Sequence, residues 1–252
     1  MSCFSFKFQR FNLVLIASLL LPAAFCFAQP GTVTLGLEYK PIFPLNFLRT
    51  GTQSTTDNLG IQYSESLNSG FNGGMVIRKS FTHLLSFETG ISYVKRQYTI
   101  NITDAGHSES SQFQIIGYEI PFSLLIYAQT GEKTFVNASM GVSPDMFASN
   151  VQTSGDNHRS FTERRSLVQA AILANLGWEY RTEESGYFYL GASFHGPLNP
   201  EFISNIYYKQ NGYDLPGVAI PLSGNYLTVD FRYFFPPDKK NVKKKDDTES
   251  PD

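Results

Sequence analysis

Apolar and polar residues alternate along most of this chain. Between positions 33 and 235 there are eight stretches in which apolar side chains take every second position and Gly, Ser, Asn or ionisable residues take the others. A period of two is typical of a β-strand with one apolar and one polar face. No stretch of similar length repeats with a helical period, so the chain is predicted to be all-β. The predicted strands centre on 33–40, 71–78, 85–93, 116–126, 136–142, 168–181, 188–195 and 227–235.

The connections between these strands alternate in length. Short turns are expected at 80–83, 129–133 and 182–186, and long loops at about 43–69, 98–112, 146–166 and 196–224. This rhythm is typical of outer-membrane barrels, and strands of about ten residues are long enough to cross the bilayer when tilted. A soluble β-sandwich or lipocalin-like barrel is the alternative, but it does not require such a rhythm. We therefore expect an eight-stranded antiparallel transmembrane β-barrel with short periplasmic turns and long extracellular loops.

The N-terminus has the pattern of a secretory signal peptide. Lys7 and Arg10 precede an apolar run at 13–21, and small residues follow it. This order predicts a signal peptide over 1–28, cleaved between Ala28 and Gln29. An uncleaved anchor is the alternative, although the run is short for a membrane span. The barrel would then occupy 29–235, and a polar, charge-balanced tail over 236–252 is expected to be disordered in the periplasm.

Composition excludes several classes of protein. Aromatic residues make up 15% of the 252 positions, charged residues only 17%, and the formal net charge is −2. So many aromatics argue against disorder, and the charge gives no reason to expect a nucleic-acid partner. Both cysteines, Cys3 and Cys26, lie in the predicted signal peptide. The exported chain would therefore have no disulfide, no thiol nucleophile and no cysteine-based metal site.

Aromatic residues gather towards the ends of the predicted strands, on their apolar faces. This is where the interfacial girdles of membrane barrels lie. Tyr and Phe are also good strand formers, so a given residue could be there for that reason alone. The candidate girdle residues are Tyr39, Tyr93, Tyr118, Trp178, Tyr180, Tyr233 and Phe235.

Four segments resemble a known family. The stretch from Gly117 to Leu125, with Tyr118-Glu119-Ile120-Pro121 within it, is similar to a strand of the PorT-like outer-membrane β-barrels of Gram-negative bacteria. Segments 135–141, 176–180 and 229–235 resemble later strands of that family. The resemblance covers nearly all of 31–235. It implies a small barrel of the cell outer membrane, inserted by the barrel-assembly machinery and without a catalytic signature. Outer-membrane lipid and lipopolysaccharide are the expected partners.

Charged residues on the polar faces would point into the barrel. An eight-stranded barrel has an interior just wide enough for side chains to fill, so we expect these charges to pair with one another. A proton or ion path, or a ligand cleft at the outer mouth, is the alternative, and it would make the protein a small channel or transporter. The expected lumen network comprises Glu38, Lys40, Arg78, Glu88, Glu119, Glu179, Asp230 and Arg232.

No enzymatic, cofactor or metal site is expected. His195 and Ser193 are the best available pair for a barrel hydrolase, because they lie two residues apart on one face of a strand. Such spacing arises often by chance, and none of the four histidines is spaced with another as in a zinc site. We therefore expect a non-enzymatic protein with no cofactor.

The last long loop is the candidate for contact with an envelope partner. It contains Tyr207, Tyr208 and Tyr213 among several prolines, and exposed tyrosines often serve recognition. The expected role is structural, adhesive or associated with envelope assembly or secretion.

Overall fold

The computed structural model describes residues 32–44, 52–182, 184–210 and 212–236. Within these ranges no helix is long and apolar enough to cross a membrane. The expected signal peptide with its cleavage site at Ala28 and Gln29, and all but the first residue of the expected tail, lie outside the described residues. The strands are β1 (Val33–Phe43), β2 (Gln53–Thr56), β3 (Gln62–Ser80), β4 (Leu85–Asp104), β5 (His107–Glu119), β6 (Phe122–Gln129), β7 (Thr134–Phe147), β8 (Val151–Ser154), β9 (His158–Arg164), β10 (Val168–Thr182), β11 (Gly186–Pro197), β12 (Phe202–Gln210), β13 (Tyr213–Asp214), β14 (Val218–Leu222) and β15 (Tyr226–Phe234).

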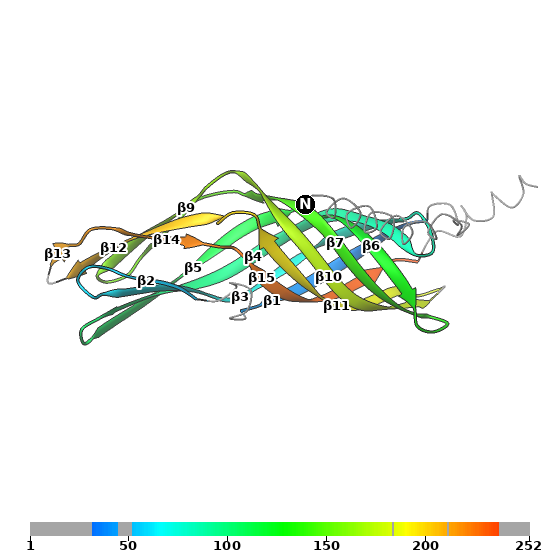
Figure 1. Cartoon of the computed structure of the whole chain (residues 1–252), viewed down its shortest axis with the longest axis horizontal. Coiled ribbons are helices and arrows are strands. Elements are labelled where there is room, and N and C mark those ends of the chain that lie inside the picture. Colours follow the sequence, from blue (N-terminus) through cyan, green and yellow to red (C-terminus); the bar gives the residue numbers. More distant parts are fainter. Residues whose placement is uncertain (1–31, 45–51, 183, 211, 237–252) are drawn as a thin grey trace, which may run out of the picture.

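Antiparallel pairing joins the long strands into a ring (Figure 1). The order runs β1–β3–β4, then β5 and β6, then β7–β10–β11–β15. It returns to its start because β15 also pairs with β1. The three short connections fall where the alternation predicts them, after Ser80, Gln129 and Thr182. They lie together at one end of the ring, on the right in Figure 1.

One expected strand is interrupted. The pattern predicts a continuous strand over 116–126, whereas β5 ends at Glu119 and β6 begins at Phe122. Pro121 lies at the break, and a proline has no N–H to donate to a neighbouring strand. β5 and β6 nevertheless share their neighbours, since both pair with β4 and with β7. Together they take one place in the ring.

The apolar faces of the ring strands point outward. On β1, Leu37 is 50% exposed, whereas its neighbour Glu38 is only 7% exposed. The same alternation runs along β6, where Leu124 and Ile126 are exposed and Ser123 is buried. A protein that folds in water buries its apolar residues, so this arrangement is inverted. The outer surface of the ring is a broad apolar band, and its interior is polar.

The long connections are folded, contrary to the expectation of polar loops. β3, β4 and β5 run on past the apolar band, so that 62–69, 98–104 and 107–112 are regular strand where loops are expected. The connections after β7 and β11 supply β8, β9, β12, β13 and β14, which form a second sheet of five strands. Segments without a clear alternation form strands there because they hydrogen-bond to segments distant in the sequence, as β9 does with β12. These elements form the left-hand half of Figure 1.

An apolar core lies between the extended ring strands and the second sheet. On β4 the apolar side chains change face: Ile91 points outward, whereas Tyr98, Ile100 and Ile102 are buried inside. The reversal falls near Arg96, where the interior changes from polar to apolar. The described core residues from both halves are Ile61, Tyr63, Leu67, Val94, Tyr98, Ile100, Ile102, Phe113, Ile115, Phe147, Phe202, Ile206, Tyr208, Ile220, Leu222 and Tyr226, with Ile42 from β1.

Candidate functional site

The ionisable residues that the sequence analysis places in the lumen all lie inside the ring. Every one is buried, with at most 9% of its surface exposed. They come from six ring strands, and each occupies an inward position of the alternation. These residues are Glu38, Lys40, Arg78, Glu88, Glu119, Glu179, Asp230 and Arg232.

Two arginines link the carboxylates at the short-turn end. Arg78 donates to Glu88 Oε2 at 3.1 Å and to Glu179 Oε2 at 2.5 Å. Arg181 Nε donates to the other oxygen of Glu179 at 2.6 Å. The pairing of β3 with β4 sets Arg78 directly opposite Glu88, so the register produces this contact. A charge removed from water needs such partners, and here each has one.

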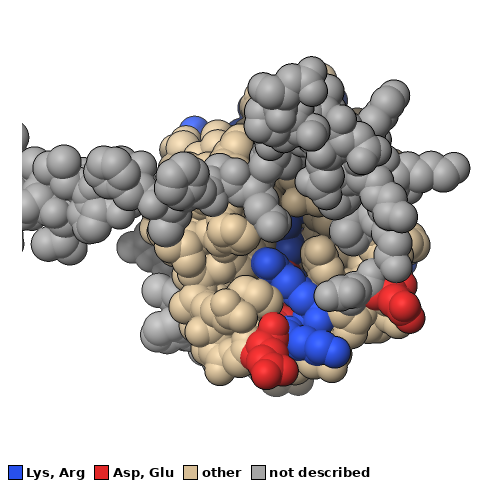
Figure 2. All heavy atoms as spheres, turned by 90° about the vertical axis from the view of Figure 1, so that its right-hand side faces the viewer, with Lys and Arg blue, Asp and Glu red and all other residues tan. Residues whose placement is uncertain are grey.

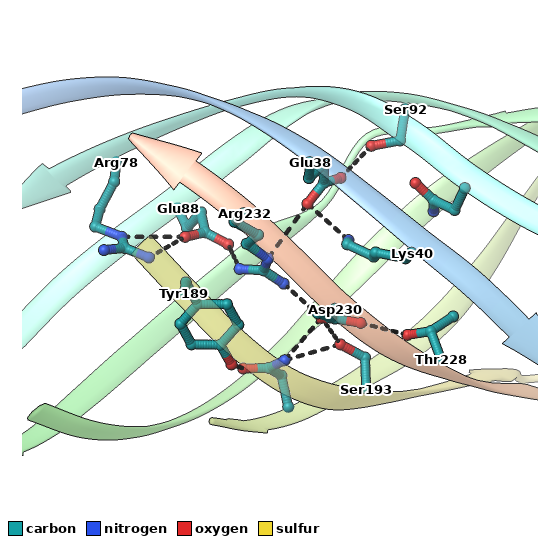
Figure 3. A network of polar contacts seen from close by, with 12 residues as sticks. Glu38, Lys40, Arg78, Glu88, Ser92, Tyr189, Ser193, Thr228, Asp230 and Arg232 are labelled. Carbon is teal, nitrogen blue, oxygen red and sulfur yellow. Dashed lines mark hydrogen bonds and ion pairs between the residues drawn. The ribbon is translucent and has the colours of Figure 1, made fainter. Parts of the chain in front are cut away.

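Arg232 continues the chain of ion pairs along the lumen (Figure 3). It donates to Glu88 Oε1 at 2.5 Å and to Asp230 Oδ2 at 3.0 Å, and its Nε lies 3.4 Å from Glu38 Oε2. Lys40 Nζ pairs with the same oxygen of Glu38 at 2.8 Å. One connected set of ion pairs therefore runs along the interior, while Glu119 lies outside it and has its ion-pair contact with His195; the connected residues are Glu38, Lys40, Arg78, Glu88, Glu179, Arg181, Asp230 and Arg232. We call it the ion-pair ladder.

The interior also contains polar residues that were not predicted to lie there. Arg96 donates to Glu201 Oε2 at 2.5 Å, beneath the apolar core. Asp145 of β7 lies 2.8 Å from His195 Nε2, and both are buried. Asn72 donates to Glu119 Oε2 at 2.7 Å. Arg96 was predictable, because the alternation of the predicted strand 85–93 places it on the inward face when continued to position 96. No alternation pattern predicts the position of Glu201.

The short-turn end has a basic centre. Figure 2 looks onto this end, and Lys or Arg side chains lie in the middle of its described surface. A cavity of about 120 Å³ opens here, lined by Arg78, Arg181 and the hydroxyls of Thr34, Ser80 and Ser86. Glu179 contacts both arginines, so one carboxylate offsets part of the positive charge at this opening.

The opposite end is closed by the apolar core, which also buries a carboxyl group. Glu65 of β3 is 1% exposed. Burial raises the pKa of Glu65 to about 7, and among the described residues neither of its carboxyl oxygens has a hydrogen-bond partner. Nearer the outer tip, burial opposes ionisation of Glu109. The backbone N–H of Asn157 and the side chain of His158 nevertheless hold the pKa of Glu109 below its usual value.

The candidate girdle residues lie on the outer surface of the ring. Tyr39, Tyr118, Trp178, Tyr180 and Phe235 are exposed. Tyr93 and Tyr233 are half-buried, because each packs against neighbouring rings. Trp178 stacks on Tyr180 with ring centroids 6.2 Å apart.

One expectation for the last long loop needs correction. Of the three tyrosines expected in an exposed loop, Tyr207 and Tyr213 are exposed, but Tyr208 is 4% exposed. Successive residues of β12 face opposite ways, so Tyr208 packs into the apolar core. Ser193 and His195, the pair considered for the hydrolase alternative, contact different residues. The Ser193 hydroxyl donates to Asp230, whereas His195 Nε2 contacts Asp145 at 2.8 Å.

Comparison with known proteins agrees with this arrangement of polar interior and apolar exterior. The sequence profile described as "Outer membrane protein beta-barrel domain" matches residues 27–203, which is more than half of the chain. The chain belongs to this family. It is therefore an outer-membrane β-barrel protein whose strands cross the membrane, and the prediction from the alternation is confirmed at this level. The narrower likeness to PorT-like barrels stays a prediction.

A solved structure has a similar fold. The crystal structure of the outer membrane protein OprG from Pseudomonas aeruginosa aligns with a TM-score of 0.52, over 83% of this chain and 98% of that chain. The two sequences are 10% identical, so the likeness concerns the fold alone. No curated protein matches this chain.

Proposed function

We propose that this protein is a non-conducting, non-enzymatic component of the outer membrane that presents a folded sheet structure at the cell surface. The chain would cross the membrane as a closed eight-stranded barrel of the PorT-like kind, exported by its signal peptide. The short turns and the C-terminal tail would lie in the periplasm. Its role would be structural, adhesive or associated with envelope assembly or secretion.

The observation that carries this proposal is the double closure of the interior. In the barrel the ion-pair ladder occupies the lumen from Arg78 to Lys40, with neighbouring charged atoms 2.5 to 3.4 Å apart. Beyond the ladder, the apolar core covers the outer end, where Phe202 and Ile206 are at most 1% exposed. An ion passing through would have to separate buried ion pairs and then cross apolar packing, and both steps are costly.

The exposed residues of the second sheet support a contact role. Phe161 of β9 and Tyr207 of β12 pack edge to face, with ring centroids 6.3 Å apart, and both stay exposed. Tyr213 of β13 is 77% exposed. Exposed tyrosines are enriched where proteins bind partners, so we propose this surface for an envelope partner or for lipopolysaccharide. Insertion by the barrel-assembly machinery is part of the same proposal.

Conductance in planar bilayers tests the proposal directly. We expect the purified protein to give no steady conductance, while a general porin in the same bilayers conducts. Insertion is verified separately by the heat-dependent gel mobility that closed barrels show. Steady unitary steps from the inserted protein would contradict the closed interior and favour the channel alternative.

The hydrolase alternative is tested by a substitution. Because Ser193 and His195 contact different carboxylates, we expect lipid and peptide turnover by membranes carrying His195→Ala to equal that of the wild type. A turnover that the wild-type protein supports and His195→Ala abolishes would overturn the non-enzymatic assignment.

A further inference from the structure

Three side chains from different strands meet inside the ring, just beneath the apolar core. They are Glu119 of β5, Asp145 of β7 and His195 of β11, and none is more than 8% exposed. His195 Nε2 lies 2.8 Å from Asp145 Oδ2 and 3.6 Å from Glu119 Oε1. One donor atom from each of the three lies within 4.8 Å of the other two. The pairing of β5 with β7 sets Glu119 opposite Asp145 and brings the two carboxylates together.

Charge distinguishes this cluster from the ion-pair ladder. Each carboxylate of the ladder lies within ion-pair distance of an arginine or lysine. Glu201 forms an ion pair with Arg96 in the same way. Among the described residues, the one ion-pair partner that Glu119 and Asp145 have is His195. Their other contacts are neutral donors, such as Ser143 to Asp145 at 2.6 Å. When both are ionised, two buried carboxylates facing one imidazole leave negative charge uncompensated, and this is costly unless a bound proton or a cation offsets it.

An unpaired oxygen at the same place points to a missing positive partner. Asn72 is 1% exposed, and its Nδ2 donates to Glu119. Its Oδ1 has no hydrogen-bond partner in the described part of the chain. Buried amide oxygens are nearly always paired, so an orphan on a side chain that contacts Glu119 calls for an explanation. A cavity of about 40 Å³ is lined by Asn72, Glu119 and His195, and it is large enough for a water molecule.

We propose that Glu119, Asp145 and His195 bind one divalent cation of the first transition series, with zinc as its representative. One imidazole nitrogen with two carboxylate oxygens is a donor set that suits zinc or manganese, whereas magnesium and calcium prefer oxygen alone. With the cation bound, Nε2, which faces the carboxylates, would be the ligand nitrogen, and the imidazole would be neutral with its proton on Nδ1. Asn72 Oδ1 and water are the candidates for the remaining positions. This goes beyond the proposed envelope role, because the cation would join three strands beneath the outer sheets.

Zinc binding to the full processed protein tests this assignment. The protein is extracted from outer membranes without a histidine tag, treated with a chelator in detergent, and titrated with zinc alone. We expect one zinc per chain by equilibrium dialysis and elemental analysis. Glu119→Gln, Asp145→Asn and His195→Gln should each weaken binding by at least about tenfold, the lower end of what losing even a supporting residue costs a metal site.

His158→Gln is the matched control. His158 is also buried, and its Nδ1 lies 2.9 Å from a carboxylate oxygen of Glu109, but that site has one carboxylate and lies outside the apolar band. We expect His158→Gln to bind zinc as the wild type does. Heat-dependent gel mobility shows which variants are folded. For any variant that folds poorly, the matched measurement is the unfolding temperature, which zinc should raise in the wild type and in His158→Gln but not in Asp145→Asn.

Two outcomes would overturn the proposal. The first is a wild-type protein that binds no stoichiometric zinc. The second is zinc bound equally well by the folded ligand variants, which would place the metal on the surface. Either would leave the cluster holding a proton in place of a cation, whereas neither bears on whether the barrel conducts.

Discussion

Replacing Arg232 by methionine tests how much the ion-pair ladder contributes to stability. The guanidinium contacts Glu88 at 2.5 Å, Asp230 at 3.0 Å and Glu38 at 3.4 Å. In Arg232→Met, Glu88 keeps Arg78 and Glu38 keeps Lys40. Asp230 loses the one basic group that the described structure places within 4 Å of it. Removing one partner of a buried pair costs about 3–5 kcal/mol, and we expect about 3 because two of the three carboxylates keep a cation.

The assay is urea-induced unfolding in lipid vesicles, followed by the fluorescence of Trp178, the one tryptophan of the chain. Adding Asp230→Asn to Arg232→Met should restore part of the lost free energy of unfolding, because it removes the carboxylate left without a cation. Lys209→Met is the control. Its ion pair with Asp214 is 3.7 Å long and exposed, so we expect a change below about 1 kcal/mol. A loss below about 1 kcal/mol for Arg232→Met would refute the reasoning.

Three further predictions concern other parts of the molecule. Glu65 has a raised pKa of about 7 in the fold, so its burial should lower the free energy of unfolding progressively as the pH rises from about 4.5 to 7. The stability of Glu65→Gln relative to the wild type should therefore increase by about 3 kcal/mol from pH 5 to pH 8. An unchanged difference in urea titrations at the two pH values would count against it. Gly191→Ala should destabilise the barrel by about 1–3 kcal/mol in the same titration, because the added methyl group would meet the Tyr189 ring in a well-packed interior. A variant as stable as the wild type would show that the ring moves aside freely. Trp178 should be quenched by brominated lipid more strongly than by aqueous iodide, since it lies on the apolar band; the opposite order would place it in water.

Much of the membrane-crossing half was predictable because one strand period encodes it. Alternation assigns Leu37 to one face and Glu38 to the other without reference to any other strand. The short turns follow from where the alternation stops. The interruption at Pro121 could also have been expected, since a proline cannot complete a ladder.

The outer half was predicted less well, although a signal for it was present. Along β4 the alternation continues beyond Tyr93, but its apolar side chains change face, so that Tyr98, Ile100 and Ile102 point inward. A strand that leaves the bilayer for water must exchange its faces in this way if it encloses an apolar core. Segments as short as β8 and β13 have no comparable pattern, because distant ladder partners stabilise them.

The cluster of Glu119, Asp145 and His195 could not be found from spacing. Its members are separated by 26 and 50 positions, and three different strands carry them. Which residues meet depends on the registers of β5 with β7, of β7 with β10 and of β10 with β11. Local pattern shows that each residue points inward, but it does not show at what height along the barrel.

The orientation of the faces of β4 tests the central claim most directly. Residues 29–252 contain no cysteine, so single cysteines can carry spin labels one position at a time. In vesicles, collisions with oxygen should be frequent at Ile91 and rare at Ser92 and Val94, and a water-soluble nickel complex should reach Gln97 and Thr103. Frequent oxygen collisions at Ser92 and Val94 with rare ones at Ile91, or equal collision rates at all three positions, would contradict a barrel with lipid outside and charges within.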